Sequence, residues 1–395
     1  MPEFKKYKIG DAIELIKDGY SPSTDEHLHY IGLEHIEQQS LRLAGVGLSS
    51  NVTSNKFRFK SGDVLFGKLR PYFRKVYRPK FDGVCSTDIW VAKAKKNFDQ
   101  GFIFYFMANE EFIDLSSQGS SGTRMPRADW NNLKNIEWEF PEKKSQTLIA
   151  SILSSLDDKI ELNRRTNQTL EQIAQTLFKK YFVDDIDPEN LPEGWRLGRI
   201  GDLGKIICGK TPSKANADLF DGMIPFIKIP DMHGETYIVE TNDSLTEEGA
   251  NSQVNKFIPE GSICISCIAT VGLVSITSLI SQTNQQINSI IPQEEKLQYF
   301  TFFLMKNLSA YLKDLGSGGT ATLNVNTTLF SNIEIVIPKK DILSTFQKEV
   351  EPMMKLILNN QNQMKQLAKI RDSLLPKLMS GEIEVNAIEK ELAEA

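Results

Sequence analysis

The longest regular pattern of apolar positions runs from Pro141 to Val183. Its apolar and amide positions recur in steps of four and three residues, which is the spacing of a coiled-coil seam. The seam residues are Ile149, Leu153, Leu156, Ile160, Asn163, Asn167, Leu170, Ala174 and Leu177. The pattern predicts one helix of roughly 40 residues, about 60 Å long at the α-helical rise. A helix of this length needs a partner to cover its apolar side.

A second long helix, predicted near the C-terminus of the same chain, can be this partner. The segment GSSGTRMPRADWNNLKNIEWEFPEK from Gly119 aligns with GSGGTATLNVNTTLFSNIEIVIPKK from Gly316, and the register continues into a second long helix without a gap. A repeat of this size indicates an internal duplication. The predicted interface of the helix pair consists of Leu153, Leu156, Ile160, Asn163, Leu170 and Leu177 together with Val350, Met353, Ile357, Asn360, Leu367 and Leu374.

Antiparallel pairing of the two helices would place a pseudo-twofold axis across the pair. Asn163 and Asn360 would then meet near the middle and fix the register, as a buried asparagine does in a coiled coil. The alternative is that each asparagine faces solvent. Pro352 predicts a kink or a restart of the second helix, because proline removes a backbone hydrogen bond.

The remaining patterns divide the chain into an α+β protein with two mixed α/β domains and two long helices in an antiparallel coiled coil. Short alternating or aromatic runs, bounded by Gly and Pro, predict strands in both domains. The expected divisions are a first mixed α/β domain (1–140), a helical arm (141–184), a linker (185–194), a second mixed α/β domain (195–337), a second arm (338–382) and an acidic tail (383–395).

Composition narrows the class of protein. The chain has 395 residues, 40% of them apolar, with a formal net charge of −5 and four cysteines. This is enough apolar content for two or three domains. No apolar run reaches the length of a membrane span and the N-terminus lacks a signal core, so a cytoplasmic location is expected. The four cysteines are too few and too unevenly spaced for a disulfide framework.

Motifs for catalysis are weak. The stretch GKIICGKT from Gly204 fits the phosphate-loop expression, which would make the chain a nucleotide hydrolase. The following Pro212 and the absence of a helical pattern after Thr211 instead favour a turn that both repeats share. Cys264 and Cys267 lack a second ligand pair and are expected in the core. We therefore expect no catalytic residues and no metal site in this chain.

A basic segment is the strongest candidate for ligand binding. Residues 55–80 contain nine Lys and Arg against one acid, interleaved with aromatic side chains, in a chain that is otherwise acidic. Such a surface suits DNA phosphates and base edges, although a solvated strand face is the alternative. The second domain offers amides instead, which suit adenine, whereas Arg and Lys suit guanine. The candidate DNA contacts are Lys68, Arg70, Arg74, Lys75, Arg78, Arg124, Arg127, Lys210, Lys214, Gln282, Asn284, Gln285 and Asn324.

Several short motifs carry a resemblance to a known family. They are LDDKIELN (156–163), LEQIAQTLF (170–178), LPEGW (191–195), GKTPS (209–213), IPEG (258–261), TNQ (283–285) and LLPKLMSG (374–381). Each is modest, but their order is specific. The chain resembles the specificity (S, or HsdS) subunits of type I restriction-modification enzymes over nearly its whole length.

The resemblance implies a non-catalytic reader of a split DNA target, with one recognition domain for each half and the helices as a spacer. It also implies partners: two modification subunits, which methylate adenine with S-adenosylmethionine, and ATP-driven restriction subunits. S-adenosylmethionine, ATP and Mg are therefore expected on the partner subunits and none of them on this chain. A stand-alone DNA-binding regulator on the same scaffold is the alternative.

Overall fold

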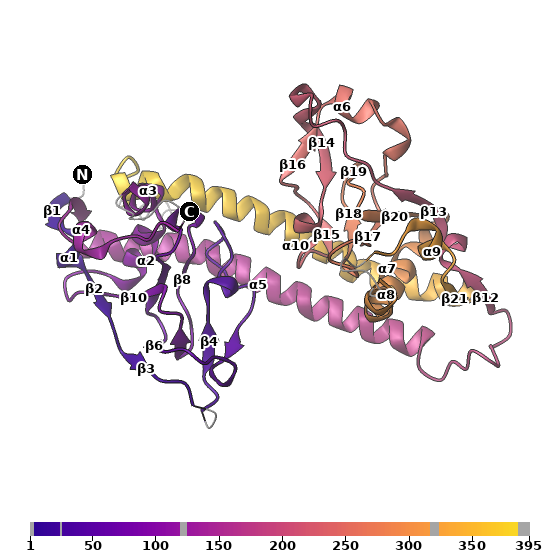
Figure 1. The fold of residues 1–395 in the computed structure, drawn as a ribbon, viewed down its shortest axis with the longest axis horizontal. Helices are drawn as coiled ribbons and strands as arrows, with labels where there is room; N and C mark the ends of the chain where they lie inside the picture. The colour runs from indigo at the N-terminus through magenta and orange to yellow at the C-terminus, as the bar shows by residue number, and fades with distance from the viewer. Residues whose placement is uncertain (1–3, 24–25, 119–124, 317–323, 386–395) are drawn as a thin grey trace, which may run out of the picture. The chain divides into compact units, whose positions relative to one another are not determined.

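The computed structural model describes residues 4–23, 26–118, 125–316 and 324–385. The chain folds as two compact units (Figure 1). Unit 1 comprises residues 1–160 and 366–395, and unit 2 comprises residues 161–365. The helix α5 (Lys143–Phe182) begins in unit 1 and ends in unit 2, whereas α10 (Lys340–Ser380) begins in unit 2 and ends in unit 1.

Unit 1 contains the N-terminal α/β fold. Its helices are α1 (Ile9–Ala12), α2 (Gln100–Ala108), α3 (Glu110–Gln118) and α4 (Trp130–Leu133). Its strands are β1 (Phe4–Lys8), β2 (Ile13–Ile16), β3 (Gly19–Tyr20), β4 (His29–Ile31), β5 (Gly47–Leu48), β6 (Lys56–Phe59), β7 (Val64–Gly67), β8 (Val76–Tyr77), β9 (Gly83–Cys85), β10 (Ile89–Ala94) and β11 (Glu137–Pro141). The apolar segment 102–118, which predicts one compact helix, is divided at Asn109 into α2 and α3.

The central sheet of unit 1 has the strand order β2-β10-β7-β8, and a second sheet has the order β3-β6-β9-β4-β5. Every residue of β7 is buried. Successive side chains of a strand point to opposite faces, so both faces of this strand must be covered. Val64 and Phe66 enter the core formed with α2, while Leu65 enters the core beneath the second sheet. The central sheet is therefore covered on both faces.

Unit 2 repeats this plan. Its helices are α6 (Glu247–Asn251), α7 (Gln298–Asn307), α8 (Ser309–Gly316) and α9 (Thr327–Ser331). Its strands are β12 (Arg196–Arg199), β13 (Gly204–Cys208), β14 (Phe220–Ile227), β15 (Tyr237–Ile238), β16 (Asp243–Leu245), β17 (Ile263–Ser266), β18 (Val274–Thr277), β19 (Gln282–Thr283), β20 (Ile287–Pro292) and β21 (Glu334–Ile337).

The strand orders of the two units correspond. The main sheet of unit 2 has the order β13-β20-β17-β18-β15, so its first four strands match β2-β10-β7-β8 of unit 1. The pair β12-β21 likewise matches β1-β11, and each of these pairs leads into a long helix. The units differ in their additional strands, since unit 2 has a three-stranded sheet in the order β16-β14-β19.

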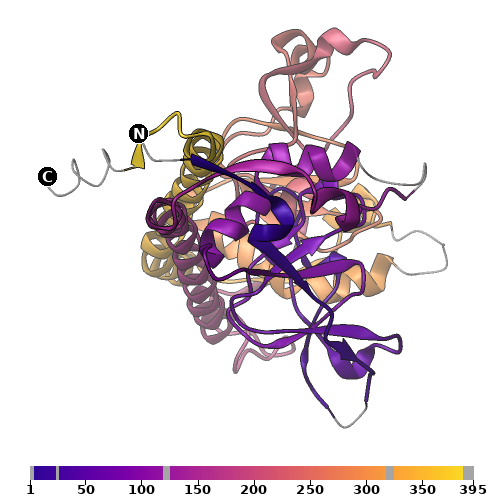
Figure 2. The same cartoon turned by 90° about the vertical axis from the view of Figure 1, so that its left-hand side faces the viewer.

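The two long helices lie side by side (Figures 1 and 2). In unit 1 the start of α5, with Ile149 and Leu153, shares a core with Leu375 and Leu378 near the end of α10. In unit 2 the end of α5, with Phe178, shares a core with the start of α10. The contact in each unit is therefore antiparallel, as predicted. The regular side-chain packing of a coiled coil stays a prediction.

The predicted helix restart at Pro352 is wrong. The helix α10 continues from Lys340 to Ser380 through Pro352 and also through Pro376. Both prolines are exposed, so their rings project into solvent. The hydrogen bonds of the surrounding turns keep the helix intact despite the donors that the prolines lack. Within the described residues, no helix has an apolar stretch long enough to cross a membrane.

Candidate nucleic-acid interface

Most cations of the basic segment 55–80 are engaged by the protein itself. Lys60 pairs with Asp82 at 2.9 Å, and Lys80 pairs with Asp158 at 2.8 Å. Arg58 lies 3.5 Å from a carboxylate oxygen of Glu26 and stacks on Tyr20. Lys56 is buried and donates to the hydroxyl and carbonyl oxygens of Ser54. The sequence-based charge of this segment therefore overstates the number of free cations.

Arg74 is a structural residue. It follows the turn Pro71–Phe73 with a φ of 48° and is buried. Its Nε donates to the carbonyl of Ala108 at 2.7 Å, and its Nη2 lies 3.2 Å from Asp372 on α10. This burial contradicts the predicted role of Arg74 as a DNA contact. Sequence could not reveal it, because Asp372 lies 298 positions away.

Lys75 and Arg78 are half-buried and also bonded. Lys75 Nζ donates to the carbonyl of Leu33 at 2.5 Å, and burial lowers the pKa of this lysine from its ordinary value. Arg78 Nε donates to the carbonyl of Gly62 at 3.3 Å. Both side chains hold neighbouring loops, so they are weaker candidates for DNA contacts than the basic pattern indicates.

The residues that stay available lie on the turn after β7. For Lys68 and Arg70, the part of the chain that the structure describes offers no side-chain hydrogen bond or ion pair, and Arg70 lies 6.0 Å from the Phe73 ring. A bridge between Leu69 and Arg127 joins this turn to the segment before α4. Arg127 is half-exposed and pairs with Asp88 through Nε at 3.1 Å. Arg124 lies outside the described residues.

In unit 2, two predicted DNA contacts are core residues. Gln282 is fully buried, donates to the carbonyl of Ala250 at 2.8 Å and accepts from Gln253 at 2.8 Å. Asn284 is buried and donates to Gln286 Oε1 at 3.0 Å. Both amides satisfy buried polar groups, as interior amides must. Their burial contradicts the predicted roles of Gln282 and Asn284 in DNA contact.

The other predicted residues of unit 2 are exposed. Lys210, Lys214, Gln285 and Asn324 all reach solvent. Gln285 accepts a hydrogen bond from Thr211 Oγ1 at 2.8 Å, which joins the GKTPS segment to the loop before β20. Asn324 forms a bridge with Ile268, which follows β17. The exposed candidates of unit 2 are therefore two lysines and two amides.

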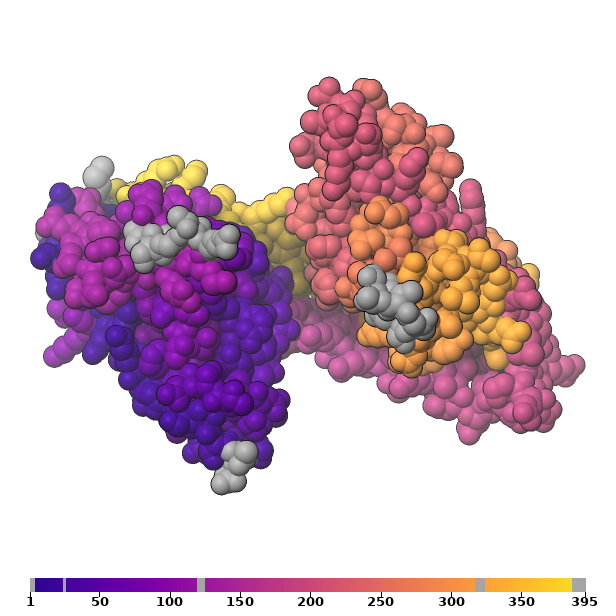
Figure 3. All heavy atoms as spheres, in the orientation of Figure 1, coloured from indigo at the N-terminus to yellow at the C-terminus, as the bar shows by residue number. Residues whose placement is uncertain are grey.

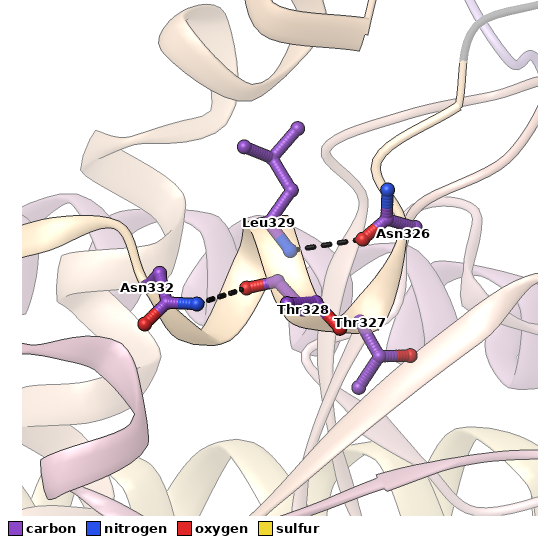
Figure 4. A pocket seen from close by; sticks show the side chains of 5 residues that line it. All are labelled: Asn326, Thr327, Thr328, Leu329 and Asn332. Atoms are coloured by element: carbon purple, nitrogen blue, oxygen red, sulfur yellow. Dashed lines mark hydrogen bonds between the residues drawn. The ribbon is translucent and has the colours of Figure 1, made fainter.

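An open hollow beside α9 extends this polar surface. Asn326, Thr327, Thr328, Leu329 and Asn332 line it (Figure 4). Asn326 caps the helix by accepting from the Leu329 amide at 2.9 Å, and Asn332 donates to the Thr328 carbonyl at 2.9 Å. Thr327 Oγ1 donates to Asn288 Oδ1 at 3.0 Å, and none of the five side chains is ionisable.

The phosphate-loop expression does not have the geometry that its chemistry requires. Residues 204–208 form strand β13, and the Lys210 amide donates to the Thr283 carbonyl at 2.9 Å. The next helical segment is only the three-residue turn Ala217–Leu219. Glycine is needed at 209 because a Cβ there would lie 2.2 Å from the Thr283 carbonyl oxygen. A helix N-terminus that could hold phosphate is therefore missing from this segment.

Cys264 and Cys267 are both buried, as predicted, and they lie in two different cores. Burial raises the pKa of Cys264 to about 12 and that of Cys267 to about 11. Thiols of this kind stay protonated at neutral pH and are chemically inert.

The residues predicted to form the interface of the helix pair are buried to different degrees. Leu153, Ile160, Asn163, Val350 and Ile357 are buried, whereas Leu156, Leu170, Leu177, Met353, Asn360, Leu367 and Leu374 are half-buried. On α10 the neighbouring residues Met354, Gln361 and Leu375 are buried instead. The α/β folds of the two units also pack on α10, so the buried side of this helix is wider than the seam alone.

The predicted contact between Asn163 and Asn360 is replaced by two others. Asn163 Nδ2 donates to Gln363 Oε1 at 2.7 Å, and Asn360 Nδ2 donates to Asn167 Oδ1 at 2.8 Å. The antiparallel register therefore differs by three to four residues, about one helical turn, from the predicted one. Asn163 is buried, so the alternative of a solvent-facing asparagine is also contradicted. Both asparagines still bond across the pair.

Comparison with known proteins agrees with this architecture. A family model for the type I restriction modification DNA specificity domain matches residues 1–172 and residues 192–371. The chain belongs to this family of specificity subunits. Each of the two matched regions begins with one recognition fold and runs into one long helix, so the family domain corresponds to half of the chain.

Two relatives and one solved structure illustrate how closely the family members correspond. The specificity subunit of the type I restriction enzyme HindI from Haemophilus influenzae is 36% identical, with 97% of this chain and 100% of the relative covered. The MjaIX specificity subunit from Methanocaldococcus jannaschii is 29% identical over 73% of this chain and 70% of its own length. The S subunit from M. genitalium has a similar fold, with a TM-score of 0.58, 16% identity and coverage of 95% and 96%.

Proposed function

We propose that this chain is the DNA-recognition subunit of a type I restriction-modification complex and reads a split target, one half with each unit. The observation that carries the proposal is the corresponding strand order of two units, each joined to one helix of a pair. Two similar folds with different surface chemistry suit two different half-sites. The chain contributes recognition, and the catalytic groups belong to its partners.

The helix pair serves as the spacer in this proposal. A helix of 40 residues, as in α5, is about 60 Å long. Half-sites that lie one helical turn apart on DNA are separated by about 34 to 36 Å. Paired helices are stiff enough to hold two readers at a set separation. Cross-helix amide contacts at Asn163 and Asn167 support a single register.

The outer faces of the helices are candidates for binding two modification subunits. Parts of both long helices reach the surface (Figure 3). Ile173 on α5 is 45% exposed, and Ile370 on α10, at the equivalent position of the sequence repeat, is 47% exposed. Apolar side chains at matched positions suit two copies of one partner. Restriction subunits would join this core, and S-adenosylmethionine, ATP and Mg would be bound by the partner subunits.

Methylome sequencing tests the function directly. DNA from cells that contain the chain and its modification subunit should carry adenine methylation at a split sequence motif. Deletion of the chain should abolish methylation at that motif. An unchanged methylome would instead favour the alternative of a stand-alone DNA-binding regulator, which would also purify without a methyltransferase partner.

Copurification tests the docking surfaces. Replacing Ile173 or Ile370 by Asp should reduce the bound modification subunits from two to one, and replacing both should remove them. Met223 is the matched control, because it is 93% exposed but lies on β14, away from the helices. Full recovery of two modification subunits with both isoleucines replaced would place the docking surface elsewhere.

A further inference from the structure

The turns after β7 and β17 are built from the same hydrogen bonds. Lys68 N donates to Asp88 O at 3.0 Å in unit 1, and Cys267 N donates to Gln286 O at 2.8 Å in unit 2. Ala128 N donates to Lys68 O at 2.9 Å, and Val325 N donates to Cys267 O at 2.8 Å. Each turn is therefore bonded to two neighbouring segments, and the segments of unit 1 are equivalent to those of unit 2.

Two further features confirm the correspondence position by position. The bridge between Leu69 and Arg127 in unit 1 matches the bridge between Ile268 and Asn324 in unit 2. Arg70 and Ala269, each next to its bridge residue, have φ values of 52° and 65°. Such left-handed conformations are costly for residues other than glycine and often mark functional sites. Arg127 is therefore equivalent to Asn324, and Arg70 to Ala269.

The equivalent positions carry different chemistry. In unit 1 they present Arg70 and Arg127, while in unit 2 they present Ala269 and Asn324, and these unit 2 residues are exposed. A bidentate arginine recognises guanine through O6 and N7, whereas an asparagine recognises adenine through N6 and N7. A small apolar side chain such as alanine fits against the methyl group of thymine. The two turns therefore carry side chains that suit different base pairs: guanine for the arginines of unit 1, and adenine or thymine for Asn324 and Ala269 of unit 2.

The contacts of Arg127 leave the required edge of its guanidinium free. Nε lies 3.1 Å from Asp88 Oδ1, and Nη2 lies 3.5 Å from Oδ2. Within the described residues, Nη1 has no hydrogen-bond partner. The carboxylate thus holds one edge of the planar fork and leaves the edge formed by Nη1 and Nη2 for a bidentate contact. Asp88 therefore fixes the guanidinium of Arg127 while about half of the side chain stays accessible to a ligand.

We propose that Arg127 and Asn324 are equivalent base-reading residues, with Arg127 contacting guanine in one half-site and Asn324 contacting adenine in the other. This inference rests on the proposed function, because it assumes that each unit reads one half of a split target. Arg70 and Ala269 flank these contacts. Asp88 is a positioning residue that orients Arg127.

Reciprocal substitutions test this inference. The chain is produced with its modification subunit, and the methylated motif is determined for the wild type and for Arg127→Asn and Asn324→Arg. Arg127→Asn should remove the preference for guanine at one position of one half-site and raise the preference for adenine there. Asn324→Arg should do the reverse in the other half-site. A discrimination change of about 5-fold to 150-fold is the expected range for one bidentate contact.

Matched controls separate base reading from general surface effects. Arg58→Asn removes another surface arginine that pairs with a carboxylate, and Asn255→Arg adds a cation at an exposed position of unit 2. Both variants should leave the two half-sites unchanged. A shift of the motif in either control, matching that of the reciprocal variants, would overturn the assignment.

The outcomes distinguish the inference from the function on which it rests. A wild-type chain that directs no split motif would refute the proposed function itself. A split wild-type motif whose two halves survive both substitutions would refute only the base-reading roles. Where a substitution abolishes methylation, purified complexes are assayed on target duplexes with all four base pairs at each half-site position. Rescue by a changed base pair supports the inference, and loss on every duplex overturns it.

Discussion

The two units hold the same pair of helices with different chemistry. In unit 1, Asp157 of α5 and Arg371 of α10 form an ion pair at 2.7 Å, and the side chain of Arg371 is only 3% exposed. At the equivalent positions of the sequence repeat, unit 2 has Met354 and Ala174, which are both fully buried. An ion pair with a buried arginine in unit 1 therefore corresponds to two buried apolar side chains of one core in unit 2.

The ion pair of unit 1 belongs to a network that reaches the recognition fold. Tyr105 of α2 donates to Asp157 at 2.6 Å, and burial raises the pKa of this tyrosine well above its ordinary value. Arg371 also pairs with Asp372, which accepts from Arg74. The network thus ties both helices and the basic segment together through directional contacts.

Unit 2 relies on aromatic packing. Phe178 of α5 lies within 6.2 Å, between ring centroids, of Phe182, Phe300, Phe303 and Phe346. Polar contacts accompany this core, and the buried Gln361 makes two of them with one backbone position. Gln361 of α10 accepts from the Tyr237 amide at 3.0 Å and donates to the Tyr237 carbonyl at 3.1 Å. The aromatic core buries apolar surface, and the directional hydrogen bonds of Gln361 fix the position of α10 against the strand that contains Tyr237.

This difference shows how a duplicated architecture keeps its halves distinct. Exchange of equivalent helix segments would place Ala174 opposite Asp157 and Arg371 opposite Met354. Such an exchange would separate the buried Arg371 from Asp157, and breaking a pair that contains a buried charge is strongly destabilising. Apolar packing alone tolerates such exchanges better, because hydrophobic contacts have little directionality.

The largest effect is expected from Phe178→Ala in the aromatic core of unit 2. Removing a fully buried phenylalanine should cost about 3 to 5 kcal/mol, because the surrounding side chains cannot fill the cavity. Hydrogen exchange of the α7 amides measures this loss within unit 2. Thr176→Ala on an exposed face of the same helix is the control and should change protection little.

Breaking the ion pair of unit 1 should have the next largest effect. Arg371→Ala should cost about 3 kcal/mol, because it removes charge-assisted hydrogen bonds to Asp157 and Asp372, which keep only Tyr105 and Arg74 as partners. The double variant Asp157→Met with Arg371→Ala copies the chemistry of unit 2 and should recover most of this loss. Hydrogen exchange of the α2 amides reports on unit 1. A double variant that is as unstable as the single one would show that apolar contacts cannot substitute at this site.

Removal of the Gln361 amide should have a smaller effect on unit 2. Gln361→Leu keeps the side-chain volume but leaves the backbone groups of Tyr237 without a partner, at a cost of about 1 to 3 kcal/mol. The exchange rate of the Tyr237 amide should rise most. An unchanged rate would mean that another group or water replaces the glutamine. Gln172→Leu, at an exposed position of α5, is the matched control.

The smallest effect concerns Glu161 on α5 and depends on pH. Hydrogen bonds from Arg164, then from Arg165, lower the pKa of Glu161 to about 2, below its ordinary value of 4.5. Its contribution to stability is therefore present above pH 4.5 and is lost as the pH falls toward 2. The site is partly exposed and screened by solvent, so Glu161→Gln should cost only about 0.5 kcal/mol at pH 7. The difference in Tm from the wild type should shrink between pH 5 and pH 3.

The sequence by itself determined the elements whose signals are local. The period of apolar positions identifies α5 and α10, and their observed ends lie close to those expected from the pattern. The shift between Gly119 and Gly316 relates the two halves, and the short motifs identify the family. Helical periodicity and repeats depend on neighbouring residues, so one chain suffices to recognise them.

Only the tertiary structure decided which side chains are available. Arg74, Gln282 and Asn284 look like surface polar residues in the sequence but are buried and bonded. The helix register could not be fixed either, because Asn163 selects Gln363 rather than Asn360 across the pair. These choices depend on partners that lie far away in the sequence and on burial, which no local pattern encodes. The sequence repeat already aligns Arg127 with Asn324, but only the structure shows that both lie beside equivalent turns that are held by the same hydrogen bonds.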